Sequence, residues 1–111
     1  MVAIALGGLA AWRLVRSFTG KVAPEKARAL VADGAKLVDV RSPAEFSAGH
    51  VDGAINVPVQ ELAQRAGELG DTAKPVVVYC ASGMRSASAV RILARAGFSQ
   101  VHDLGAMARW R

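Results

Sequence analysis

The only cysteine of this 111-residue chain, Cys80, opens the segment CASGMRS at residues 80–86. It follows the apolar run PVVVY and precedes a segment with helical spacing, so it is predicted to lie where a buried strand ends and a helix begins. A thiol at a helix N-terminus ionises readily, because the backbone N–H groups there favour negative charge. The position therefore predicts a reactive thiolate rather than a cysteine kept for packing.

The residues after Cys80 could form a cradle for its sulfur. If the backbone of residues 81–85 curls around that atom, successive N–H groups point inward and form an anion-binding nest. Glycine can take the positive φ angle of such a turn, and arginine adds a permanent cation suited to oxyanions. We therefore predict that Cys80 is catalytic, that Ser86 caps the helix with its hydroxyl toward the sulfur, and that six residues bind the substrate: Ala81, Ser82, Gly83, Met84, Arg85 and Ser86.

Charged residues also gather where a second predicted strand ends. We predict that Asp39, Arg41 and Glu45 give structural support at the base of the loop, with Arg41 paired to one or both acids. His50 is read as part of a turn held by hydrogen bonds, since an ionised thiol needs no general base. Asn56 is read as a residue that braces the backbone.

The body of the chain alternates predicted helices and strands. This order is typical of an α/β fold with a parallel sheet flanked by helices on both faces and right-handed crossovers. In such sheets ligands bind beyond the carboxyl ends of the strands, where Cys80 is expected. Helices are predicted at 24–32, from the capping box at 42–45 to about 49, and at 60–69 and 86–96; strands are predicted at 36–40, 54–57, 75–79 and 100–103, with a closing helical turn at 105–110.

Composition narrows the classes of function. With 52% hydrophobic and 21% charged residues, the chain is predicted to fold as a globular unit. Its net charge is +5, but three of these charges, Arg13, Arg16 and Lys21, lie in the first 21 residues, which contain no acid. We therefore expect no nucleic-acid partner. A single cysteine forms no internal disulfide, and no cluster of cysteine and histidine has metal-ligand spacing, so neither a metal nor a cofactor is expected.

The start of the chain is an apolar run, residues 2–12, within a predicted N-terminal helix at 1–20 that is separate from the domain at 21–111. Three interpretations stay open: a membrane anchor that contacts the bilayer through residues 2–18, a helix packed on the domain or on another copy, and the shortened remainder of a longer anchor. As an anchor, its basic residues on the C-terminal side would keep the domain on the cytoplasmic face. Without an anchor, the protein is expected to be cytoplasmic.

Several segments, in order, carry a resemblance to a known family. From about residue 22 to 110 the chain resembles a single-domain rhodanese, a sulfurtransferase. The resemblance implies a rhodanese-like α/β fold. The family's usual Gly-Gly near the end reads Gly105-Ala106 here, a departure expected to bear on packing rather than chemistry. The matching segments are LVDVR at 37–41, EF at 45–46, GHVDGAINVP at 49–58, VVYCASGMRS at 77–86 and DLGAMARW at 103–110.

The resemblance implies a ping-pong transfer of sulfane sulfur. Cys80 thiolate would take the outer sulfur of thiosulfate or a related donor, release sulfite and keep a persulfide. Arg85 matches the family's loop arginine and would attract the sulfonate. Cyanide or a cellular thiol would then accept the sulfur, and this acceptor must come from outside because the chain holds no second cysteine.

Two other functions compete with this one. The first is a membrane-tethered persulfide carrier or binding module that does not turn over thiosulfate efficiently. The second is a cysteine-based phosphatase or arsenate reductase, in which, as the family resemblance implies, the loop between cysteine and arginine is one residue longer. Here only residues 81–84 separate Cys80 from Arg85, and the tighter loop suits a sulfur atom better than a tetrahedral phosphate.

Overall fold

The computed structural model describes residues 20–111. The predicted N-terminal helix and its membrane contact through residues 2–18 lie outside the described residues, and they stay predictions. Within residues 20–111, none of the helices combines the length and the apolar character that a membrane span requires.

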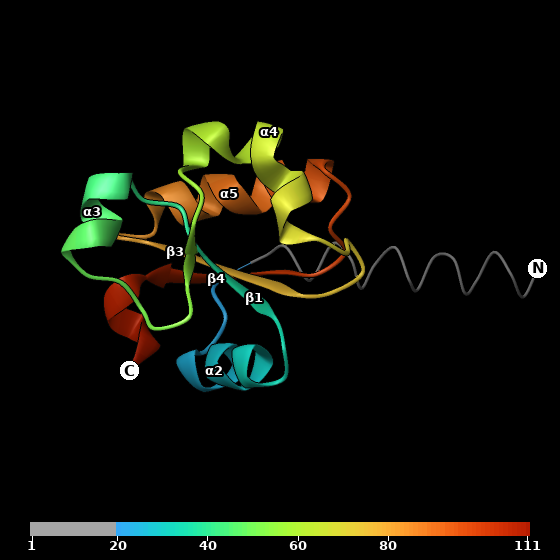
Figure 1. The fold of residues 1–111 in the computed structure, drawn as a ribbon. Helices are drawn as coiled ribbons and strands as arrows, with labels where there is room; N and C mark the ends of the chain where they lie inside the picture. The colour runs from blue at the N-terminus through green and yellow to red at the C-terminus, as the bar shows by residue number, and fades with distance from the viewer. Residues whose placement is uncertain (1–19) are drawn as a thin grey trace, which may run out of the picture.

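Four parallel strands form one sheet, in the order β2-β1-β3-β4 (Figure 1). The predicted α/β fold is therefore confirmed. Because the strands are parallel, their carboxyl ends share one edge of the sheet, and Cys80 lies at that edge as the last residue of β3. The strands are β1 (Lys36–Asp39), β2 (Ile55–Asn56), β3 (Val76–Cys80) and β4 (Val101–Ala106).

Helices cover both faces of the sheet, as Figure 1 shows. The helix α2 (Pro24–Ala32) and the short 3₁₀ helix η3 (Met107–Trp110) pack on one face. On the other face lie α4 (Leu62–Arg65) and α5 (Met84–Arg95). The helix α3 (Pro43–Ala48) follows β1 and begins with the predicted capping box, which is confirmed.

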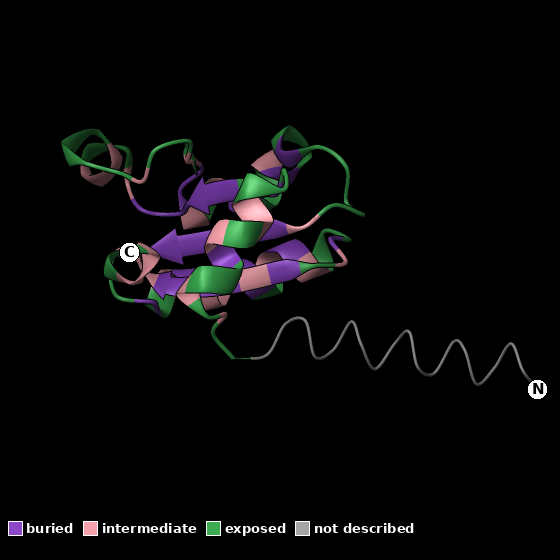
Figure 2. Cartoon of the chain, turned by 90° about the horizontal axis from the view of Figure 1, so that it is seen from below, coloured by how far each residue is buried: buried purple, intermediate pink, exposed green. Residues whose placement is uncertain are grey.

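The central strand β3 is buried along its whole length, and Figure 2 shows the strands of the sheet coloured largely as buried. Successive side chains of a strand point to opposite faces. Val76, Val78 and Cys80 accordingly belong to the core on the α5 side, whereas Val77 and Tyr79 belong to the core on the α2 side. The strand β3 therefore contributes to both cores, and its final residue, Cys80, belongs to the core on the α5 side.

Three predicted elements differ from the structure. In place of the expected helix at 60–69 the structure has three short pieces. A single α-helical turn, α4, is flanked by the 3₁₀ helices η1 (Val59–Glu61) and η2 (Ala66–Leu69). The helix α5 begins at Met84, two residues early, because Gly83 takes the N-cap position with φ of 103°. The strand β4 continues through Gly105 and Ala106, which pair with Tyr79 and Cys80, so the closing turn is η3 alone.

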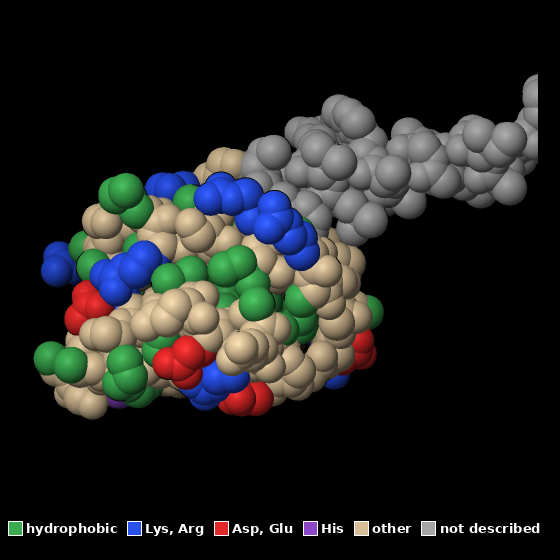
Figure 3. All heavy atoms as spheres, turned by 90° about the horizontal axis from the view of Figure 1, so that it is seen from above, with side chains coloured by type: hydrophobic (Ala, Val, Ile, Leu, Met, Phe, Trp, Pro, Cys, Tyr) green, Lys and Arg blue, Asp and Glu red, His purple; other side chains and the backbone are tan. Residues whose placement is uncertain are grey.

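The surface on the α4 and α5 side carries charges of both signs. Basic side chains form more than one group there, and acidic side chains lie on the same face (Figure 3). A face of mixed sign is typical of a solvated surface rather than of one built to follow a phosphate backbone.

Candidate active site

The sulfur of Cys80 is enclosed by the loop that joins β3 to α5. Its Sγ accepts hydrogen bonds from the backbone N–H of Gly83, at 2.9 Å, and of Ser86, at 3.4 Å. The residue has no solvent-exposed surface. Of the residues 81–85 predicted to turn their N–H groups inward, Gly83 does so and supplies the positive φ angle, and the second donor, Ser86, follows directly after them.

The loop changes the acidity of the thiol in two opposing ways. Burial raises the pKa of Cys80, because the charged form loses water, whereas the hydrogen bonds from the N–H groups of Ser86 and Gly83 lower it. The net effect places the pKa of Cys80 below its ordinary value. The sulfur also lies at the N-terminal end of α5, where the helix dipole favours a negative charge.

Ser86 differs from its predicted role as a helix cap. It lies inside the first turn of α5, since the N-cap position belongs to Gly83. Its hydroxyl donates to the carbonyl oxygen of Gly83 at 3.1 Å, while its N–H points to the sulfur. Ser86 therefore ties the start of the helix to the loop as well as donating to Cys80.

The tip of the loop is open to solvent. Ala81 and Ser82 are exposed, and Met84 is 80% exposed, one of two exposed large hydrophobic side chains among the described residues. Whatever reaches Cys80 from solvent along this loop must therefore pass small or flexible side chains.

Arg85 pairs with Glu45 across the mouth of the loop. Two parallel hydrogen bonds join the guanidinium to the carboxylate, at 2.7 and 3.0 Å. The hydrogen bonds from Arg85, aided by the N–H of Ser42, lower the pKa of Glu45 to about 2. We expected Glu45 to support the loop base with Arg41; it contacts the loop arginine instead. Because the two residues are 40 positions apart, no local sequence pattern predicts that they pair.

Arg41 pairs with Asp39 alone, one of the two alternatives predicted for it. Its Nη2 lies 2.6 Å from Asp39 Oδ2 and donates to the carbonyl oxygen of Gly49 at 2.7 Å. Asn56 donates to the carbonyl oxygens of Asp39 and Arg41, each at 2.9 Å, which matches the bracing predicted for it. These contacts lock the carboxyl end of β1 to the segment after α3.

His50 lies in the turn after α3. Its Nδ1 is 2.8 Å from the carbonyl oxygen of Phe46, and the two rings stack with centroids 3.6 Å apart. A carbonyl only accepts, so Nδ1 carries the proton in this contact. The contacts agree with the structural reading of this residue.

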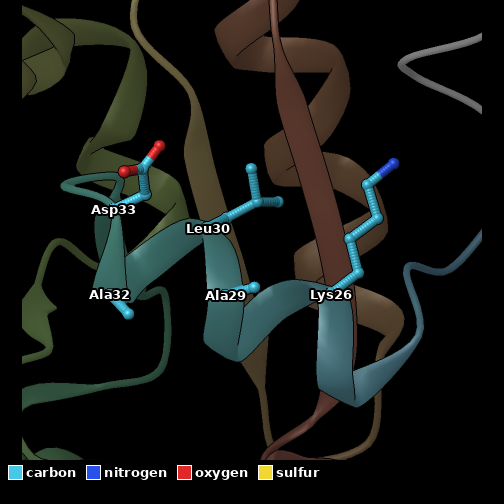
Figure 4. A pocket seen from close by; sticks show the side chains of 5 residues that line it. All are labelled: Lys26, Ala29, Leu30, Ala32 and Asp33. Carbon is cyan, nitrogen blue, oxygen red and sulfur yellow. The ribbon is translucent and has the colours of Figure 1, made fainter.

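A hollow of about 560 Å³ lies along α2, away from the cysteine loop. It is lined by Lys26, Ala29, Leu30, Ala32 and Asp33 (Figure 4). The helix α2 covers the face of the sheet opposite to α5, so this hollow does not include the residues around Cys80.

Comparisons with known proteins agree with the geometry. Residues 23–111 match the model of the rhodanese-like domain. The chain is 37% identical over 92 residues to the thiosulfate sulfurtransferase GlpE of Pseudomonas aeruginosa, and the matched residues cover 82% of this chain and 83% of GlpE. It is 42% identical over 77 residues to the uncharacterized protein YqhL of Bacillus subtilis, covering 68% of this chain but only 60% of YqhL, less than two thirds of that protein.

Solved structures show the same fold. The human single-domain sulfurtransferase TSTD1 superposes with a TM-score of 0.73 at 29% identity, covering 83% of this chain and 95% of that one. A rhodanese with anions from E. coli superposes with a TM-score of 0.66 at 34% identity, covering 68% and 91%. With a family model that spans most of its length and relatives of this similarity, the chain belongs to the rhodanese-like sulfurtransferase family.

Proposed function

We propose that this protein transfers sulfane sulfur from thiosulfate, or a related donor, to a thiophilic acceptor through a persulfide on Cys80. The observation that carries the proposal is the environment of the Cys80 sulfur. The sulfur accepts hydrogen bonds from two backbone N–H groups at the N-terminal end of α5, and the pKa of its thiol is lowered. The relatives named thiosulfate sulfurtransferase support the choice of donor.

The first half of the reaction loads the sulfur. An electron pair on the Cys80 thiolate attacks the outer sulfur of thiosulfate and forms a new S–S bond. The S–S bond of thiosulfate breaks, and its electron pair leaves with sulfite. In the product, a persulfide on Cys80, the negative charge lies on the outer sulfur, and we propose that the loop N–H groups hold it as an oxyanion hole holds its anion, while those of Gly83 and Ser86 contact Sγ.

The second half of the reaction transfers the outer sulfur of the persulfide to an acceptor. The acceptor, cyanide in an assay or a thiolate in the cell, attacks the terminal sulfur. The S–S bond of the persulfide breaks, and its electron pair returns to Cys80 as thiolate. Thiocyanate or an acceptor persulfide is released, and no oxidant or reductant is consumed.

Access to the sulfur sets a requirement on the loop. Cys80 is buried, whereas Ala81, Ser82 and Met84 are exposed. The donor must therefore displace the loop tip slightly to reach the sulfur. Arg85 is partly exposed and paired with Glu45, and we propose that its guanidinium also binds the sulfonate of the donor.

Intact-mass spectrometry after treatment with thiosulfate tests the loading step. The wild-type protein should gain the mass of one sulfur atom and lose it again on addition of cyanide, with thiocyanate released over many turnovers. Loading followed by a stall after one turnover would indicate a carrier instead. Hydrolysis of an aryl phosphate without sulfur loading would indicate a phosphatase and would overturn the proposal.

A further inference from the structure

Lys21 fills a notch between two glycines beside the cysteine loop. The notch lies between Gly83, the N-cap of α5, and Gly105 in β4, which have φ angles of 103° and 88°. Lys21 Cδ and Cε lie 2.8 Å from the position that a Cβ of Gly105 would occupy. Lys21 Cε and Nζ lie 3.4 Å from the corresponding position at Gly83. At Gly105 the lysine stem therefore stands where a side chain would otherwise be, whereas at Gly83 it lies at ordinary van der Waals distance from that place.

The backbone and the ammonium group both hold Lys21 in this place. Lys21 pairs with Asp103 in a parallel bridge at the edge of β4, and the N–H of Val22 donates to the Asp103 carbonyl at 2.8 Å. The ammonium lies 3.7 Å from Asp103 Oδ2, and the other carboxylate oxygen is buried without a hydrogen-bond partner in the described part of the chain. The side chain also borders a hollow of about 200 Å³ that reaches Arg91.

Gly83 is held by hydrogen bonds through its N–H and its carbonyl, and Lys21 borders its remaining side. Its N–H points to the sulfur of Cys80, and its carbonyl accepts from Ser86 Oγ at 3.1 Å and from the N–H of Ala87 at 3.2 Å. On the side where a side chain would stand, the nearest atoms belong to Lys21 and to Gly105. Glycine is the most permissive residue of the backbone, so the orientation of its N–H depends on such contacts.

We infer that Lys21 is a positioning residue for the sulfur chemistry: its alkyl stem keeps the Gly83 N–H aimed at Cys80. The inference rests on the proposed function, because it concerns the stabilisation of the same thiolate and persulfide. It assigns the effect to the stem, because Cδ and Cε lie 2.8 Å from the Cβ position of Gly105, and at Gly83 the stem atom Cε lies as near as Nζ, each 3.4 Å from the Cβ position.

Two variants at this position separate stem from charge. Lys21→Met keeps a side chain that reaches as far as Cε but loses the ammonium, whereas Lys21→Ala loses both. Both leave Asp103 without its cation, so any effect of that ion pair appears equally in the two. Lys36→Ala is the control, an exposed lysine at the start of β1, the opposite end from the loop.

The pH dependence of alkylation by iodoacetamide reports the pKa of Cys80 in each variant. In Lys21→Ala the pKa should rise by about half to one unit, which slows alkylation roughly three- to tenfold at a pH below the pKa, the size expected for weakening one hydrogen bond. Lys21→Met and Lys36→Ala should match the wild type, and persulfide loading should follow the same order.

The inference fails if Lys21→Ala keeps the wild-type pKa, or if Lys21→Met shifts it as far as Lys21→Ala does. A wild-type pKa at the ordinary value, with no sulfur loading, would overturn the proposed function instead. The two failures are therefore distinguishable in one series.

Discussion

The carboxyl ends of β1 and β3, each with the segment that follows it, lie at the same edge of the sheet but are built in opposite ways. At the end of β1, Arg41 pairs with Asp39 at 2.6 Å and donates to the carbonyl oxygen of Gly49. Asn56 donates to the carbonyl oxygens of Asp39 and Arg41. At the end of β3, the sulfur of Cys80 is held by backbone N–H groups. At the end of β1 the charged side chains already have partners, so they support the structure. At the end of β3 the sulfur relies on neutral peptide groups, which can stabilise a charge formed during the reaction.

The largest contrast between the two segments concerns activity. Cys80→Ser should abolish persulfide formation and thiocyanate production, because a hydroxyl at this place stays protonated and is a poor sulfur nucleophile. Intact-mass spectrometry and a thiocyanate assay measure the two effects. Thiocyanate production at the wild-type rate by this variant would mean that Cys80 is not the nucleophile.

The segment after β1 should instead govern stability. Asp39→Ala leaves a buried guanidinium unpaired and should lower the free energy of unfolding by about 3–5 kcal/mol, measured by urea denaturation. Glu68→Ala is the control, because its pair with Arg65 is exposed and its loss should change stability little. Equal losses in both variants would show that the segment after β1 is no special support.

Gly83 combines both properties, since it shapes the loop and adopts a strained backbone. Gly83→Ala should cost about 1–2 kcal/mol of stability for the positive φ angle and should also raise the pKa of Cys80 by moving its N–H donor. Gly34→Ala, at φ of 106° with open space around it, should cost similar stability but leave sulfur transfer unchanged. If both variants keep full activity, the loop tolerates distortion at Gly83, and the position of this N–H does not matter for sulfur transfer.

Arg85 should have a smaller effect, confined to donor binding. Arg85→Ala should raise the apparent KM for thiosulfate roughly tenfold with kcat little changed, because a partly exposed charge-assisted contact is lost. Steady-state kinetics in thiosulfate measure this. Arg85→Lys should recover part of the affinity, since it keeps the charge but not the planar fork; a KM unchanged in Arg85→Ala would remove this residue from donor binding.

The smallest effect is a dependence of stability on pH. The pKa of Cys80 is lower in the folded state than in the unfolded chain. The thiolate therefore contributes stability above the unfolded pKa, and this contribution is lost as the pH falls through the folded pKa. The stability of the wild type relative to Cys80→Ser should rise with pH in that window, measured by urea denaturation under reducing conditions below and above about pH 8.5. A flat difference would contradict the lowered pKa.

Local patterns in the sequence were enough to predict where Cys80 lies. The apolar run before it, the glycine after it and the helical spacing beyond report short-range backbone preferences and burial, and these are the properties that sequence patterns carry. The capping box at Ser42 and Glu45 was predicted for the same reason, because its partners are three residues apart.

Only the tertiary structure decided which distant groups meet around the cysteine loop. Glu45 reaches Arg85 because α3 follows a strand adjacent to β3, and Lys21 reaches Gly83 and Gly105 because the chain enters along the edge of β4. These contacts depend on strand order and register, which arise from packing of the whole sheet and leave no periodic trace along the chain. The sequence by itself determined that Cys80 lies between a buried strand and a helix; the fold determined which distant side chains surround that junction.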